Sequence, residues 1–73
     1  MSVFDLKKGE SAKVVSIAVD GAAGERLNSL GIKSGALVTA AAFSLFSGSV
    51  LILVGYNRVA LRKSVAQRIE VAL

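Results

Sequence analysis

The sequence contains no cysteine, no histidine and no proline. Without cysteine no disulfide can form and no thiolate can bind a metal, and nothing indicates an oxidising compartment. Without histidine there is no imidazole for general-base catalysis, and serines that lack a base are not activated as nucleophiles. We therefore expect that the protein is not an enzyme.

Acidic residues are few and scattered along the chain. None of them stands at a spacing that is typical of metal ligands, and the glycines between Gly24 and Gly35 do not form a Walker phosphate motif. The sequence therefore predicts no metal site, no cofactor and no nucleotide site of its own. The carboxylates, which we expect to be solvated surface charges, are Asp5, Glu10, Asp20, Glu25 and Glu70.

Formal charge is also absent from every position between Ser34 and Asn57. As one helix this run is long enough to cross a bilayer, for which about 20 apolar residues suffice. As two strands joined by a polar loop it builds a small barrel instead. The segment from Ser44 to Ser49 is rich in serine and contains Gly48, which is typical of a loop. This favours the two strands, although composition alone leaves the membrane helix open.

The chain has 73 residues, of which 53% are hydrophobic. This length predicts one domain, residues 1–73, with a small core. The hydrophobic fraction exceeds what such a core needs, which indicates that part of the surface is covered by a partner. The first ten residues are charged and contain no apolar segment of the kind found in secretory signals, so we expect a cytoplasmic protein.

Apolar periodicity predicts the elements of the first half. Residues Ala12 to Val19 alternate as a half-buried strand does, with Val15, Ile17 and Val19 on one face. Residues Ala22 to Ser29 follow a helical period that ends before Gly31. Ser34 and Gly35 form a turn into a second strand, Ala36 to Phe43.

The second half predicts a β-hairpin from Val50 to Arg62 with Tyr56 and Asn57 as its loop. Ser64 is placed to cap a single helical turn through Ala66 and Gln67, and Ile69 to Leu73 forms the last strand. Five short strands and one short helix result. These are too few for a sandwich, so we expect a mainly β fold, a small, partly open barrel of the SH3-like or OB type, with the connections favouring the SH3-like form.

Several segments, in this order and spacing, resemble the FeoA domain. Residues 26–35 (RLNSLGIKSG) are similar to the helix end, the Leu-Gly corner and the glycine turn of that family. Residues 49–54 and 58–63 resemble its hairpin, and residues 69–71 resemble its last strand. Relatives often carry a Gly-Asp-Pro or Gly-Gly-Pro turn before the third strand, whereas this chain has Ser47-Gly48-Ser49.

The resemblance implies a small cytosolic accessory protein of bacterial ferrous iron uptake. Its partner would be the cytosolic part of FeoB, the large membrane transporter that carries a GTP-binding domain. The same domain also occurs at the C-terminus of DtxR-like repressors, but this chain has no room for their winged helix or dimerisation helices. The stand-alone accessory role is the better match.

The hairpin geometry suggests which residues bind this partner. With a Tyr56-Asn57 loop, Val54 opposes Val59 and Ile52 opposes Leu61, so these residues point into the barrel together with Val50. Leu51, Leu53, Ala60 and Arg62 then point outward. We predict a docking surface formed by Leu45, Phe46, Leu51, Leu53, Arg58 and Arg62.

Two alternatives to this surface remain open. The short helix, through Leu27 and Leu30, could cover the outward leucines as a second small core. A three-residue hairpin loop would exchange the two faces and turn Val50, Ile52 and Val54 outward. In each case one apolar face of the strand needs a cover.

The net charge of +4 suggests a second class of function, a basic barrel that binds nucleic acid. Arg58, Arg62, Lys63 and Arg68 cluster near the C-terminus, but Tyr56 is the sole aromatic residue near them, which does not favour nucleic acid. A third possibility is a peptide-binding adaptor unrelated to iron. The cations can also meet acidic residues of the transporter or the anionic membrane beside it, and the apolar surface can support self-association.

Overall fold

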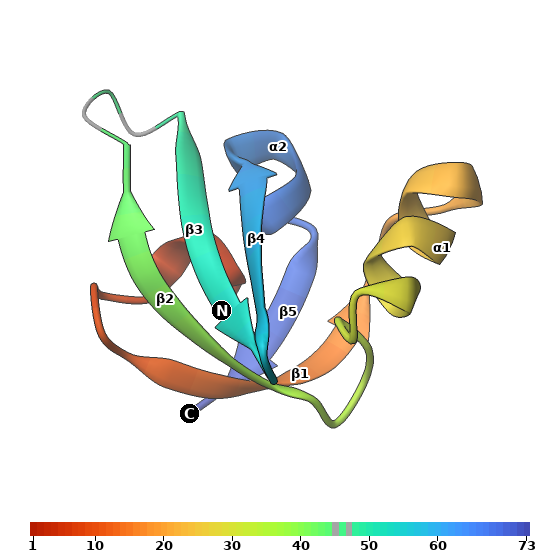
Figure 1. The fold of residues 1–73 in the computed structure, drawn as a ribbon, viewed down its shortest axis with the longest axis horizontal. Helices are drawn as coiled ribbons and strands as arrows, with labels where there is room; N and C mark the ends of the chain where they lie inside the picture. The colour runs from red at the N-terminus through yellow and green to blue at the C-terminus, as the bar shows by residue number, and fades with distance from the viewer. Residues whose placement is uncertain (45, 47) are drawn as a thin grey trace.

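The computed structural model describes residues 1–44, 46 and 48–73. Five antiparallel strands form one sheet in the order β4-β3-β2-β1-β5, and it does not close into a full barrel. Figure 1 shows β2, β3 and β4 as one layer in front of β1 and β5, with α1 to one side. The elements are the short 3-10 helix η1 (Val3–Asp5), β1 (Ser11–Ile17), α1 (Gly21–Ser29), β2 (Leu37–Phe43), β3 (Ser49–Val54), β4 (Asn57–Arg62), α2 (Lys63–Ala66) and β5 (Ile69–Ala72).

This arrangement is an SH3-like fold, and it confirms the mainly β prediction with one short helix of nine residues. The uncharged run from Ser34 to Asn57 forms β2 and β3, so the prediction of two strands is confirmed and the single helix is wrong. No helix in the described part of the chain is long and apolar enough to cross a membrane.

The core consists of aliphatic side chains from every layer. Both sides of the β3-β4 hairpin contribute alternate residues to it, and Leu27 of α1 is buried among them. Phe4 and Phe43 pack edge to face at its rim, with ring centroids 5.6 Å apart, and Lys63 Nζ lies 5.5 Å from the Phe4 ring centroid. The largest fully buried side chains are Ile32, Ile52, Ile69, Val3, Val38 and Val50.

The hairpin loop lies one residue earlier than predicted, which shifts the pairing of β3 with β4 by two residues. Val54 pairs with Asn57, so Gly55 and Tyr56 form the turn, and Ile52 opposes Val59 rather than Leu61. Gly55 has a φ of 58°, which a two-residue hairpin turn requires and which glycine adopts without strain. A shift of two residues leaves each side chain on its original face. The inward face was therefore predicted correctly despite the wrong loop, and a three-residue loop is excluded.

Two other local predictions were wrong. A β-bulge between Val14 and Ser16 breaks the alternation of β1, so Val14 is buried and Val15 is exposed, while Ile17 pairs with Ile69. Ser64 does not cap α2, because that helix begins at Lys63 and Arg62 occupies the N-cap position.

At Gly24, helix α1 packs very closely against the chain segment that precedes the helix. A Cβ atom at this position would collide with the carbonyl oxygen of Val19. We expect Gly24→Ala to destabilise the fold by about 1–3 kcal/mol, as overpacking does. Helix propensity alone predicts the opposite sign, a gain of about 1 kcal/mol. Urea unfolding that showed a stabilised Gly24→Ala variant would contradict this close contact.

The N-terminal turn makes the stability of the fold depend on pH. The backbone N–H of Ser2 donates to Asp5 Oδ2 at 2.8 Å, which lowers the pKa of Asp5 below its ordinary value of 3.8. Because the folded-state pKa is the lower one, this contribution is present above pH 3.8 and is lost as pH falls through the folded value. Below pH 4, the melting temperature of Asp5→Asn should therefore change less with pH than that of the parent protein. Identical pH profiles would contradict this role.

Candidate protein-docking surface

The outer face of the sheet carries apolar residues in the middle of strand β3. Leu53 lies opposite Thr39 of β2 on one side and Arg58 of β4 on the other. Leu51 lies in the next row, between Ala42 and Ala60. Side chains in neighbouring strands at paired positions share a face, so the two leucines point outward side by side. Leu53 remains 37% exposed and Leu51 is half-buried.

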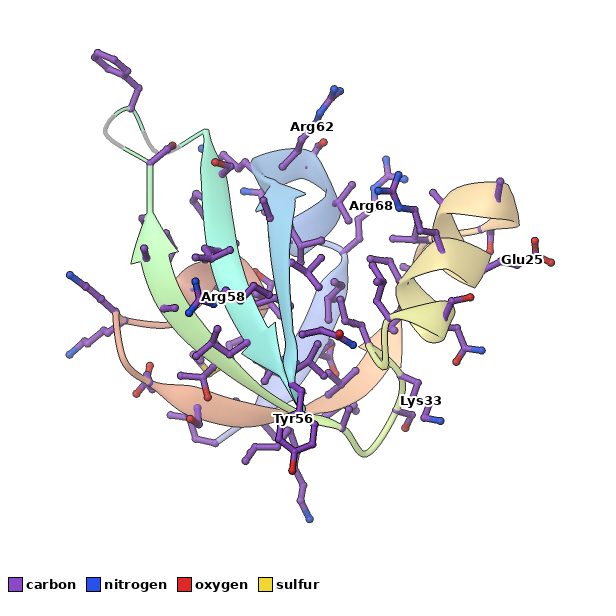
Figure 2. The ribbon with its side chains drawn as sticks, viewed as in Figure 1. Glu25, Lys33, Tyr56, Arg58, Arg62 and Arg68 are labelled. Atoms are coloured by element: carbon purple, nitrogen blue, oxygen red, sulfur yellow. The ribbon has the colours of Figure 1, made fainter. Side chains whose placement is uncertain are left out.

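Two residues that the sequence analysis did not propose extend this face. Leu37 of β2 is 58% exposed, and Tyr56 in the hairpin turn is fully exposed. Together with Thr39 and Leu53 they line one shallow hollow of about 720 Å³. We call Leu37, Leu51, Leu53 and Tyr56 the leucine patch. Figure 2 shows Tyr56 at the end of the sheet where the hairpin turns.

The structure does not place all predicted docking residues in one cluster. Phe46 is 94% exposed, but it belongs to the loop between β2 and β3, at the end of β3 opposite to the hairpin turn. Leu53 lies four residue steps along the strand from Ser49, a distance of about 13 Å. Phe46 therefore lies beyond the far end of the leucine patch. Leu45 lies outside the described residues.

The two predicted arginines are both exposed on β4 and stand at different ends of the face. Arg58 is paired with Leu53, and Arg62 is paired with Ser49 near the β2-β3 loop. In Figure 2 the Arg58 side chain extends across β3, whereas Arg62 points away from the sheet beside α2. Arg58 thus adjoins the leucine patch, and Arg62 is closer to Phe46.

Helix α1 does not cover the leucine patch. Leu27 is buried in the main core, and Leu30 packs at its edge, where it borders both Val59 and Leu61 and the hollow of the leucine patch without covering Leu53. Asn57 Nδ2 donates to the Leu30 carbonyl oxygen at 3.1 Å, which ties the end of α1 to the start of β4. The second small core that the sequence left open is therefore not formed, because Leu53 keeps its exposure.

Sequence reasoning missed Leu37 and Tyr56 for different reasons. Leu37 and Thr39 alternate with the buried Val38 and Ala40, so the periodicity of this strand contained the signal. Tyr56 was assigned to the turn as a structural residue, and its contribution to the hollow depends on the pairing of β2 with β3, which is not visible in local sequence.

The described residues around this surface offer apolar area and one cation rather than a cluster of metal-ligating side chains. Among residues 1–44, 46 and 48–73, no three carboxylate, histidine or cysteine side chains come together as a metal site would require. Apolar area with a cation beside it is a composition that protein contacts often have.

Comparison with known proteins decides the family. A model of the FeoA domain family matches residues 1–73. The chain belongs to the FeoA domain family. Among curated proteins, none matches the sequence.

Solved structures agree with this assignment. The FeoA protein from Chlorobium tepidum is 28% identical with a TM-score of 0.92, covering 97% of this chain and 68% of that one. FeoA from Stenotrophomonas maltophilia, solved with zinc and described as a prokaryotic SH3 domain protein, is 34% identical with a TM-score of 0.83, covering 99% and 89%. A manganese-dependent transcriptional repressor shares the fold at 22% identity and a TM-score of 0.85, and 35% of its chain is covered.

Proposed function

We propose that this FeoA-family chain is an accessory protein of bacterial ferrous iron uptake. It binds the cytosolic part of the FeoB-type membrane transporter and modulates the activity or assembly of that transporter. Family membership supports the role in iron uptake. The FeoA of Stenotrophomonas maltophilia has been described as a candidate activating factor of ferrous iron transport, which supports the same role here.

The observation that carries the binding proposal is the leucine patch. Leu37 and Leu53 are large exposed apolar side chains on neighbouring strands that line one hollow, and Arg58 is paired with Leu53. An interface that forms over such a patch buries apolar area without requiring the backbone to rearrange. Contact with the membrane is then indirect, through the transporter.

Equilibrium binding between the purified chain and the purified cytosolic part of the transporter tests this proposal. It should be measured without nucleotide, with GDP and with a non-hydrolysable GTP analogue, because the partner carries the GTP-binding domain. Saturable binding in at least one state is the expected result. A complete absence of binding in all three states, or displacement of the transporter fragment by single-stranded RNA, would contradict it.

A further inference from the structure

Strand β4 has one unpaired edge. It is the terminal strand of the sheet, with β3 as its neighbour. In a hairpin with a two-residue turn, the flanking residues Val54 and Asn57 form a hydrogen-bonded pair, and every second residue of β4 continues this pattern toward β3. The backbone N–H of Lys63 donates to the Gly48 carbonyl oxygen at 3.0 Å, which agrees with this phase.

The residues between these bonded positions therefore point backbone groups away from the sheet: both the N–H and the C=O of Arg58 and Ala60, and the N–H of Arg62, whose C=O accepts the first bond of α2 as its N-cap. Within the described residues, none of the three takes part in a backbone hydrogen bond outside the regular elements. An edge of this kind is a template for another strand.

A groove of about 620 Å³ runs beside this edge, between β4 and α1. Leu27 of α1 and Leu30, which follows the helix, line it on one side, Leu61 lines it from β4, and Val65 lines it from α2. Figure 1 shows α1 standing apart from β4. The groove thus has an apolar floor on the inward side of β4.

The outward side of the same edge is positively charged. Arg58 and Arg62 stand on the outer face of β4, and Arg26 of α1 also lines the groove. No described carboxylate lines it, and Figure 2 shows Glu25 directed away from it. A strand added here would meet apolar side chains on its inner face and arginines on its outer face.

A second copy of this chain fits the edge poorly. If two β4 strands paired antiparallel about Ala60, Arg58 of one copy would lie opposite Arg62 of the other. Like charges that face each other across strands are destabilising, whereas opposite charges stabilise the pair. The arginines therefore oppose self-pairing and favour a strand that carries carboxylates.

We propose that the β4 edge binds an extended segment of another protein, which adds to the sheet as a further strand. This segment alternates apolar residues, which enter the groove, with acidic residues, two of which pair with Arg58 and Arg62. The proposal goes beyond the proposed function, because it concerns the backbone edge of β4 and the groove beside it rather than the leucine patch, with Arg58 bordering both, and it holds whichever protein supplies the segment.

A blocked peptide of about eight residues that alternates valine with glutamate is the probe. We expect saturable binding by isotope-labelled NMR titration, with the amide signals of Arg58, Ala60 and Arg62 shifting and becoming protected from hydrogen exchange. A peptide with lysine in place of glutamate is the control and should not bind. Equal binding of both peptides, or no binding of either, would overturn the proposal.

Ala60→Pro removes the N–H that faces the groove and leaves the bonds to β3 in place, since proline is tolerated at such edge positions. It should weaken the binding of the glutamate peptide at least about tenfold, which corresponds to a loss of about 1.4 kcal/mol of binding free energy. Ala60→Thr keeps the N–H and should retain affinity. If Ala60→Pro does not fold by circular dichroism, Ala23→Trp blocks the groove from the exposed helix side and should produce the same loss.

Charge is tested separately. The double variant Arg58→Glu with Arg62→Glu should lose at least about tenfold in affinity, as opposed cross-strand charges at both positions predict. Lys8→Glu with Lys33→Glu changes the net charge equally at exposed positions outside the groove and should lose far less. Equal losses in the two double variants would show that net charge alone attracts the peptide and would overturn the proposed pairing. Single-stranded RNA binding that depends on the arginines but not on Ala60 would also overturn it.

Discussion

Replacing Leu53 with aspartate is expected to abolish binding of the transporter's cytosolic part while the protein stays folded. Leu53 points outward and is 37% exposed, so an aspartate there is solvated in the free protein. In the complex the same carboxylate would be buried in an apolar contact without a partner. The cost of burying it predicts a loss of affinity of at least about a hundredfold, as for a central residue of an interface.

The matched control for this variant is Val15→Asp. Val15 is also an exposed apolar residue on a strand, at 46% exposure, but it lies on β1 outside the leucine patch. It should bind the transporter fragment as the parent does. Surface substitutions of this kind change stability by about 0.5 kcal/mol or less, which urea unfolding of both variants checks. Unchanged binding by Leu53→Asp, or an equal loss in Val15→Asp, would remove the leucine patch from the account.

Replacing Ile52 with alanine is expected to cost about 2–5 kcal/mol of unfolding free energy. Ile52 is fully buried in the core between the two layers of the barrel. Its neighbour Leu51 is half-buried on the other face, so Leu51→Ala should cost clearly less. Native domains have unfolding free energies of only about 5–15 kcal/mol, so the Ile52 variant should show a large drop in its urea midpoint. Equal costs for the two variants would mean that the faces of β3 are assigned wrongly.

The sequence was informative where a pattern is local. The helix predicted at Ala22–Ser29 is found at Gly21–Ser29, because its apolar period and the glycine after it are both short-range signals. The inward face of β3 was also predictable, since alternation survives a shift of two residues. The loop itself was misplaced because Tyr56 and Asn57 were given the turn positions, whereas Gly55 tolerates the positive φ that the turn needs.

Other features depend on contacts between distant segments. The bulge at Val15 arises in the pairing of β1 with β5, so the alternation of β1 alone could not reveal it. The same holds for the leucine patch, in which Leu37 and Leu53 line one hollow because β2 pairs with β3. The groove beside β4 depends on where α1 packs against the sheet, which local sequence does not reveal, and it was not predicted. Surface sites of this kind are products of topology rather than of a sequence motif.

Ferrous iron uptake in cells tests the central claim most directly. A bacterial strain that carries the transporter but lacks this chain would be supplied with the parent protein, with Leu53→Asp or with Val15→Asp, at equal measured abundance. We predict that the parent and Val15→Asp change the rate of uptake of labelled ferrous iron, in the same direction, and that Leu53→Asp leaves it as in the deficient strain. An uptake rate that is the same with and without the parent protein, or that Leu53→Asp restores fully, would contradict the account.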